Sequence, residues 1–147
     1  MNNGRPGAVT ILVVEDNPGD VRLMREALSG CSDHCRLITV PDGEQAIRFL
    51  RRVEPFEDAA RPDLIFLDLN LPRKDGREVL GEIKSDPALR RIPVIVLTTS
   101  EADRDVHRAY DLHANCYLRK PTDLDEYLAV IRACENFWLH FVRLPDE

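Results

Sequence analysis

The most informative part of this chain is the stretch Leu64-Ile65-Phe66-Leu67-Asp68-Leu69-Asn70-Leu71-Pro72-Arg73-Lys74-Asp75-Gly76. A short apolar run leads straight into the carboxylate of Asp68, and turn-forming residues follow at once. Such a run is typical of a buried strand in a parallel sheet. Pro72 cannot continue a central strand, and Gly76 permits a backbone turn that other residues resist. Asp68 is therefore expected either at the ligand-binding carboxyl edge of a sheet or as the cap of a following helix.

The composition is that of an ordinary soluble globular protein. The chain has 147 residues, of which 44% are hydrophobic and 31% charged, and its formal net charge is −6. This length suits one core, so we expect a flexible lead-in at residues 1–8 and a single domain at residues 9–147. The lack of a basic block disfavours nucleic-acid binding. Because no long apolar run or signal peptide is present, we expect a cytoplasmic protein that does not enter a membrane.

The cysteines do not form a CxxC pair. They are Cys31, Cys35, Cys116 and Cys134. Cys31 and Cys35 flank His34, which makes a metal site conceivable, but a fourth ligand is not evident. We favour small buried or half-buried thiols in a reducing cytosol.

Strand-like and helix-like segments alternate along the chain. The expected strands are Val9–Val14, Arg36–Val40, Leu64–Asp68, Ile92–Leu97 and Asn115–Leu118. Helical spacing of apolar residues follows each of them, and the last helix is expected to start near Thr122 as its N-cap. Because the connections suit only right-handed crossovers, the sheet should be parallel and doubly wound.

Polar side chains follow the ends of four of these strands. They are Glu15, Asp16, Asp68, Thr98 and Lys120. Because the ends of parallel strands share one edge, three carboxylates, a hydroxyl and an ammonium should meet in one crevice. Each has an ordinary alternative, as a helix cap, a strand-end hydroxyl or a surface lysine. Their joint occurrence at one edge favours a functional site.

The chemistry of this set suits phosphoryl transfer. Adjacent carboxylates repel one another unless a cation intervenes, and hard oxygen ligands favour Mg²⁺ over zinc. A bound dication makes the crevice receptive to a phosphoryl group. Asp68 could then act as the nucleophile and form an aspartyl phosphate. Lys120 would neutralise oxygens of the transferring group, and Thr98 could donate a hydrogen bond to one of them.

Four segments together form a known pattern. They are Val13–Asn17, Leu67–Pro72 with Gly76, Leu97–Ser100 and Tyr117–Pro121. In order and spacing they resemble the receiver domains of two-component response regulators, and they span nearly the whole chain. The resemblance implies a flavodoxin-like (βα)5 fold, a doubly wound parallel sheet with strand order 2-1-3-4-5.

The resemblance also implies a metal and phosphorylation site. It makes Asp68 the phosphoacceptor and a direct Mg²⁺ ligand together with Asp16. Asn70 would contribute its backbone carbonyl, and Glu15 would hold a metal-bound water.

Further roles at the same edge follow from the family. Thr98 resembles the switch hydroxyl, Tyr117 the coupled aromatic, and Lys120 the phosphate partner that precedes a cis peptide at Pro121. One departure is His113, which stands where receivers usually have a glycine between the fourth helix and the fifth strand. A positive φ is tolerable for histidine but less comfortable than for glycine.

Within the family, the chain is most similar to small stand-alone regulators that serve phytochrome-type sensor histidine kinases. The segments that suggest this are 68–100 and Asn136–Leu139. Such a protein would not be an enzyme in the usual sense, although it would catalyse its own phosphorylation and slow dephosphorylation. Since no output domain follows the last helix, we expect signalling through protein–protein contacts with a downstream partner that the sequence does not identify.

Rival functions fit less well. A phosphatase of the haloacid dehalogenase type needs a second carboxylate two residues after its nucleophile, where Asn70 stands, and also a cap domain. A Rossmann nucleotide binder needs a glycine-rich loop after the first strand, which this chain lacks. A receiver that only docks to partners would not need the complete acidic set, and a phosphorylation measurement would decide that case.

The last helix carries two apolar stripes. The first consists of Leu124, Leu128 and Ile131, with Glu135 in line, and suits packing onto the sheet. The second consists of Tyr127, Val130, Cys134, Phe137 and Phe141, with Trp138 beside it. One stripe suffices to cover a core, so the second predicts an exposed apolar patch and a homodimer. The alternative is that the tail bends back and buries these rings within the monomer.

Overall fold

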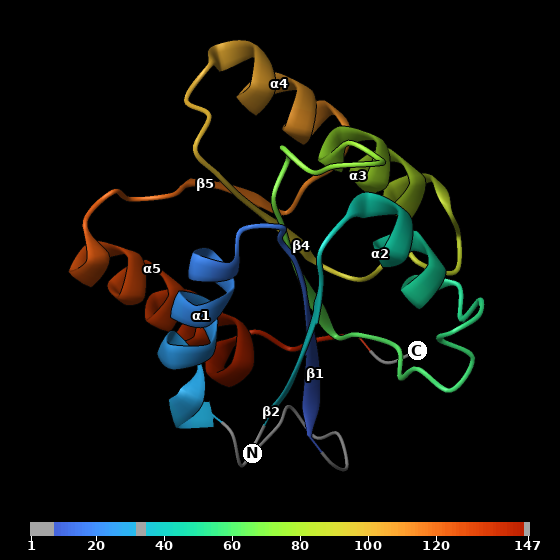
Figure 1. Cartoon of the computed structure of the whole chain (residues 1–147), viewed down its shortest axis with the longest axis horizontal. Coiled ribbons are helices and arrows are strands. Elements are labelled where there is room, and N and C mark those ends of the chain that lie inside the picture. Colours follow the sequence, from blue (N-terminus) through green and yellow to red (C-terminus); the bar gives the residue numbers. More distant parts are fainter. Residues whose placement is uncertain (1–7, 32–34, 146–147) are drawn as a thin grey trace.

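The computed structural model describes residues 8–31 and 35–145 of the chain. Within these residues, five parallel strands form one sheet in the order β2-β1-β3-β4-β5 (Figure 1). The strands are β1 (Val9–Val14), β2 (Cys35–Val40), β3 (Leu64–Leu67), β4 (Val94–Thr98) and β5 (Cys116–Arg119). This confirms the predicted flavodoxin-like fold. The lead-in predicted at residues 1–8 lies outside the described residues except for Ala8.

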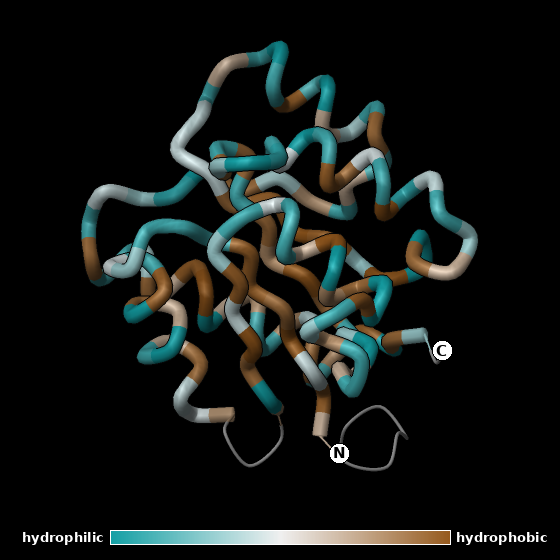
Figure 2. The backbone as a smooth tube through the Cα atoms, turned by 45° about the vertical axis from the view of Figure 1, so that its right-hand side comes forward, coloured by the Kyte–Doolittle hydropathy of each residue, from teal (hydrophilic) through white to brown (hydrophobic). Residues whose placement is uncertain are grey.

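Helices cover both faces of the sheet. On one face lie α1 (Pro18–Ala27) and α5 (Leu124–Asn136), and on the other lie α2 (Gly43–Leu50), α3 (Gly76–Ser85) and α4 (Asp103–Asp111) (Figure 1). A 3-10 turn, η1 (Ser29–Cys31), follows α1, and a π-helical turn, η2 (Phe137–Phe141), extends α5. The three central strands, β1, β3 and β4, are buried along their length and mostly apolar, as a sheet covered on both faces requires. Figure 2 shows the hydrophobic segments running through the middle of the molecule. No helix in the described part of the chain has the length and apolar character needed to cross a membrane.

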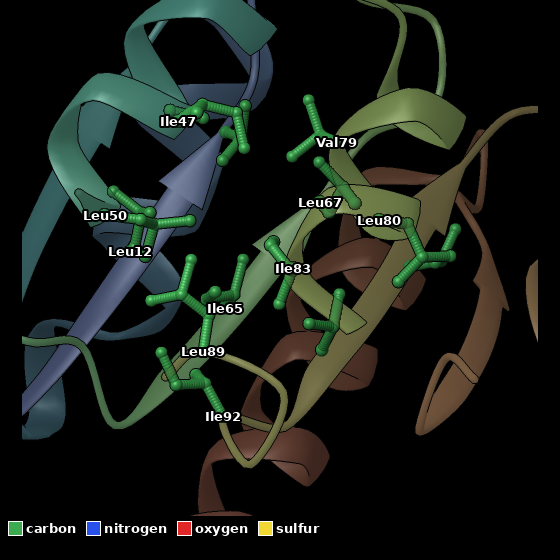
Figure 3. Close-up of a cluster of buried hydrophobic side chains, with 14 of the residues drawn as sticks. Leu12, Ile47, Leu50, Ile65, Leu67, Val79, Leu80, Ile83, Leu89 and Ile92 are labelled. Atoms are coloured by element: carbon green, nitrogen blue, oxygen red, sulfur yellow. The ribbon is translucent and has the colours of Figure 1, made fainter. Parts of the chain in front are cut away.

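The strand β3 divides its side chains between two cores. Ile65 and Leu67 pack with α2 and α3 on one face, where Figure 3 labels them. Leu64 and Phe66 point to the opposite face and pack with α1 and α5. Successive residues of a strand face opposite ways, so one short apolar run serves both layers. The strand is thereby held rigidly, and Asp68 directly follows it.

Capping side chains fix where the helices begin. The Oδ1 atom of Asn17 accepts hydrogen bonds from the backbone N–H groups of Gly19 (2.9 Å) and Asp20 (3.1 Å). For α5, the cap is Asp123 and not Thr122 as predicted, because the Asp123 carboxylate accepts a hydrogen bond from the N–H of Glu126. A carboxylate at this position also interacts favourably with the positive end of the helix dipole.

The prediction of free thiols is wrong for one pair of cysteines. Cys31 and Cys35 form a disulfide, because η1 and the start of β2 bring their Cα atoms to 5.6 Å. His34 lies outside the described residues. Cys116 and Cys134 are free and half-buried, as predicted. Burial raises the pKa of the Cys116 thiol to about 11 and that of the Cys134 thiol, which also lies near Cys116, to about 12.

Candidate functional site

Backbone hydrogen bonds align the ends of neighbouring strands. The N–H of Asp68 donates to the carbonyl of Val14 (3.1 Å), and the N–H of Lys120 donates to the carbonyl of Thr98 (2.7 Å). Since β1 lies beside β3 in the sheet, Glu15 and Asp16 follow the strand next to Asp68. The five predicted side chains therefore share the carboxyl edge.

Three carboxylates form a cluster at this edge. Glu15, Asp16 and Asp68 each offer one oxygen within 4.8 Å of the others. Glu15 and Asp68 are buried, whereas Asp16 is exposed. Burial, together with the Asp68 charge, raises the pKa of Glu15 to about 7 although Lys120 opposes the shift. Such a group of hard oxygen ligands suits a divalent cation.

Asn70 lies close to the cluster through its backbone. Its N–H donates to Oδ1 of Asp68 at 3.2 Å, while its side chain is exposed. This contact orients the Asp68 carboxylate. The predicted role of the Asn70 carbonyl as a metal ligand stays a prediction.

Lys120 contacts three carboxylates at this edge. Its buried Nζ lies 2.6 Å from Oε1 of Glu15, 2.8 Å from Oδ2 of Asp20 and 2.9 Å from Oδ2 of Asp68. Burial alone would lower the pKa of Lys120, but the hydrogen bonds to these three carboxylates raise it above its ordinary value. Asp20 was missed in the sequence because it belongs to the first turn of α1, where acidic residues are common for local reasons.

The predicted cis peptide before Pro121 is wrong. Among the described residues, the cis peptide bond is Glu54–Pro55. The Lys120–Pro121 bond takes the trans form that most X-Pro bonds adopt, and Lys120 still reaches Asp68. The prediction of a positive φ at His113 is confirmed, with a value of 71°.

The two predicted switch residues lie on adjacent strands. Thr98 is fully buried, and its Oγ1 has no hydrogen-bond partner among the residues that the structure describes. Tyr117 is half-buried, and its hydroxyl donates to the carbonyl of Ser100 at 3.0 Å. A buried hydroxyl without a partner is unfavourable, so Thr98 is poised to bond an acceptor that arrives at this edge.

A polar network that the sequence did not reveal lies beside Tyr117. The Ser100 hydroxyl donates to Oδ2 of Asp105 at 2.6 Å. The other oxygen of Asp105 lies 2.9 Å from Nη2 of Arg77, whose Nη1 also contacts Asp75 at 3.0 Å. The network therefore joins α3, α4 and the loop after β4, in which the Ser100 carbonyl accepts the hydrogen bond from Tyr117.

Gly76 has a different role from the one predicted. Its φ is not in the left-handed region, so no special turn conformation is required. A Cβ atom at this position would lie 2.2 Å from the carbonyl oxygen of Asp68 and 2.5 Å from Cα of Leu69. Glycine is needed because α3 begins directly against the backbone that carries Asp68.

The predicted assignment of stripes on α5 is partly wrong. Tyr127 was expected at an interface, but it is only 3% exposed and packs in the core with Met24 and Phe66. Leu124 was expected to pack on the sheet, but it is 54% exposed. The direction in which the chain enters α5 turns Tyr127, rather than Leu124, toward the sheet.

The remaining interface residues form a partly exposed patch. Phe137 is 53% and Phe141 73% exposed, whereas Val130, Cys134 and Trp138 are half-buried. The tail also folds back in part, since Leu139 and Leu144 are buried in the core.

Comparison with known proteins defines the class of this protein. Residues 11–132 match the family model of the response regulator receiver domain, so the chain belongs to that family. It is 50% identical over 135 residues to the response regulator Rcp1 of Synechocystis sp., and the match covers 92% of each chain. It is 39% identical to the probable methanogenesis regulatory protein FilR2 of Methanothrix harundinacea, with 92% of this chain and 86% of the relative covered.

Solved structures place it near phytochrome response regulators. The phosphorylated cyanobacterial phytochrome response regulator RcpA superposes with a TM-score of 0.93 at 48% identity, covering 95% of this chain and all of RcpA (100%). The Mn²⁺-bound form of Rcp1 superposes with a TM-score of 0.91 at 48% identity, covering 94% and 99%. The bacteriophytochrome response regulator AtBRR gives 0.74 at 32% identity, covering 96% and 100%.

Proposed function

We propose that this response regulator accepts a phosphoryl group on Asp68 from a phytochrome-type sensor histidine kinase, in a reaction that requires Mg²⁺. The observation that carries the proposal is the pairing of Asp68 with Lys120, whose Nζ lies 2.9 Å from the Asp68 carboxylate inside an acidic cluster. The kinase type follows from the phytochrome response regulators that this chain resembles. The cytoplasm is the proposed location, and residues 9–147 are the proposed receiver unit.

Each residue of the site has its own role in phosphoryl transfer. Glu15, Asp16 and Asp68 would hold Mg²⁺, which neutralises phosphoryl charge when bound. An oxygen of Asp68 attacks the phosphorus of a phosphohistidine, and the leaving nitrogen keeps the electron pair of the broken bond. Lys120 stabilises the oxygens of the transferring group. Slow hydrolysis of the acyl phosphate at the same site would reset the protein.

The buried Thr98 hydroxyl connects this chemistry to signalling. A phosphoryl group on Asp68 would give Thr98 Oγ1 the acceptor that it lacks among the described residues. Movement of Thr98 would leave space for Tyr117 to rotate and release Ser100. The new charge on Asp68 would thereby shift Tyr117 from one position to another and so change the surface beside β5.

Labelling with a small phosphodonor tests the proposal. The protein is incubated with Mg²⁺ and acetyl phosphate, and we expect an acid-stable, hydroxylamine-labile adduct on Asp68. Asp68→Asn should abolish the adduct, EDTA should prevent it in the wild type, and Asp111→Asn on the exposed end of α4 serves as the matched control. Labelling of Asp68→Asn at the wild-type rate would disprove the assignment.

We further infer that the protein is a homodimer through the face formed by α5, η2 and the edge strand β5. A groove of about 440 Å³ supports this inference. The groove is lined by Asn115, Cys116, Leu118, Val130, Ala133, Cys134, Phe137 and Trp138. Apolar and aromatic side chains are favoured at the centres of interfaces. Tyr127 is left out because it is buried in the monomer.

Sedimentation tests the dimer. Wild-type protein at micromolar concentration should sediment as a dimer and Phe137→Asp as a folded monomer. Val53→Asp is the matched control, because Val53 is a similarly exposed apolar residue (48%) outside this face. A monomeric wild type, or equal dissociation of both variants, would contradict the dimer.

A further inference from the structure

One carboxylate beside the phosphorylation site has no role in the function proposed above. Asp20 belongs to the first turn of α1, and its Oδ2 lies 2.8 Å from Nζ of Lys120. Within the described residues, the acidic cluster that could hold a metal ion consists of Glu15, Asp16 and Asp68 and does not include Asp20. Asp20 therefore contacts Lys120 without belonging to the metal-binding group.

The start of α1 fixes the position of Asp20. The N–H of Asp20 donates to Oδ1 of Asn17 (3.1 Å), and the N–H of Asn17 donates to Oε2 of Glu15 (3.1 Å). The helices α1 and α5 lie side by side on one face of the sheet (Figure 1), and Lys120 stands in the segment between β5 and α5. The carboxylate of Asp20, which is 23% exposed, is thus held beside Lys120 by the start of a helix.

The hydrogen-bond donors of Lys120 are fully used. An ammonium group has three N–H donors, and Lys120 has three carboxylate acceptors at hydrogen-bonding distance, on Glu15, Asp20 and Asp68. Two of these acceptors, Glu15 and Asp68, are also candidate metal ligands. A dication on the same carboxylates repels the ammonium and competes for their oxygens, so these two hydrogen bonds weaken when a metal is bound. Of the three hydrogen bonds, the one to Asp20 does not share its acceptor with the metal.

We propose that Asp20 is a positioning residue, which keeps the Lys120 ammonium beside Asp68 while a dication occupies the acidic cluster. This inference rests on the function proposed above, in which Lys120 stabilises the oxygens of the transferred phosphoryl group. The negative charge of Asp20 offsets the repulsion between the ammonium and the dication, and its oxygen gives the ammonium a fixed acceptor. One N–H of Lys120 stays on Asp20, and another is then available to a phosphoryl oxygen.

Proton exchange between the Lys120 ammonium and water tests this inference without phosphorylation. In the full chain, NMR of isotope-labelled lysine side chains should show a protected Lys120 signal both without Mg²⁺ and at saturating Mg²⁺. Asp20→Asn keeps the size of the side chain and removes its charge. Its Lys120 signal should persist without Mg²⁺ and exchange about ten-fold faster with Mg²⁺. Equal protection of Lys120 in Asp20→Asn, or loss of the wild-type signal on addition of Mg²⁺, would overturn the inference.

Binding of beryllofluoride, which imitates a phosphoryl group on an aspartate, measures the consequence for the site. In calorimetric titrations at saturating Mg²⁺, Asp20→Asn should bind beryllofluoride about ten-fold more weakly than the wild type, because a charge-assisted hydrogen bond of Lys120 is lost. The variant should fold as the wild type does, since the Asn17 cap bonds the backbone N–H of Asp20 and not its side chain.

Asp125→Asn is the matched control. Asp125 is exposed in the first turn of α5 and is not among the carboxylates that contact Lys120 in the described part of the chain. The control therefore removes the same charge from the start of a helix, and it should bind beryllofluoride as the wild type does. Equal weakening in Asp125→Asn would attribute the effect to net charge and refute the role of Asp20.

The wild-type titration separates this inference from the proposed function. If the wild type does not bind beryllofluoride in the presence of Mg²⁺, the proposed function fails and the role of Asp20 fails with it. If the wild type binds and Asp20→Asn binds equally well or more tightly, the phosphorylation site stands and the role of Asp20 is refuted.

Discussion

Arg77 of α3 and Asp105 of α4 form an ion pair with an N–O distance of 2.9 Å and with side chains only 18% and 15% exposed. The Ser100 hydroxyl binds the same carboxylate, and the Ser100 carbonyl accepts from Tyr117. The hydrogen bond from Ser100 and that from Arg77 lower the pKa of Asp105. This pair therefore fixes α4 against α3 and holds Tyr117 through one intermediate residue.

The first prediction concerns the pH dependence that this pair gives the fold. Because the folded-state pKa of Asp105 is depressed, its contribution to stability is present above the ordinary value of 3.8 and is lost as pH falls through the folded pKa. Thermal unfolding of the wild type should therefore lose more stability on acidification than Asp105→Asn does. Arg77→Gln should reduce the difference, and a double-mutant cycle should show coupling between the two positions. If the effects of the two substitutions on stability were additive, the expected coupling between Arg77 and Asp105 would be contradicted.

The second prediction concerns the packing of α3 against Asp68. Gly76→Ala should destabilise the protein by about 2 kcal/mol or more, because its Cβ would collide with backbone that cannot move aside. Gly81→Ala in the same helix is the matched control. There the nearest atom to a new Cβ, Cδ2 of Leu112, lies 3.7 Å away. Its higher helix propensity should stabilise the protein by about 1 kcal/mol in urea unfolding.

The third prediction concerns the buried hydroxyl of Tyr127. This oxygen has no hydrogen-bond partner among the described residues, and burial raises the pKa of Tyr127. Tyr127→Phe should therefore raise the free energy of unfolding by about 1 kcal/mol and leave the sedimentation of the protein unchanged. Tyr110→Phe serves for comparison, because the Tyr110 hydroxyl accepts from the N–H of Tyr117 at 3.2 Å and its removal should not stabilise. If Tyr127→Phe instead dissociated a dimer, this result would support the original prediction that Tyr127 lies in the interface.

The sequence predicted the sheet and the site because both depend on local signals. Val9–Val14 and Leu64–Leu67 are apolar runs that end in carboxylates, and the shared edge of a parallel sheet then brings Glu15 and Asp68 together. Asp20 could not be predicted, since its contact with Lys120 depends on the path from β1 into α1.

Features that depend on tertiary placement were also missed. Two stripes on α5 have the same helical spacing, so the pattern could not tell that Tyr127 and not Leu124 faces the sheet. The Cys31–Cys35 bond depends on the approach of η1 to β2, for which the sequence gives no distance. The Arg77–Asp105 pair joins helices that are separated by a whole strand.

The last prediction concerns Thr98 as the link between phosphorylation and Tyr117. Thr98→Ala should still be phosphorylated by acetyl phosphate and Mg²⁺, because Lys120 and the acidic cluster are intact. It should lose the change at Tyr117, since no hydroxyl then moves toward the phosphoryl group. NMR signals of the labelled Tyr117 ring, recorded before and after phosphorylation, measure this change. Thr98→Ser keeps the hydroxyl and should retain the response, whereas a full response in Thr98→Ala would place the switch elsewhere.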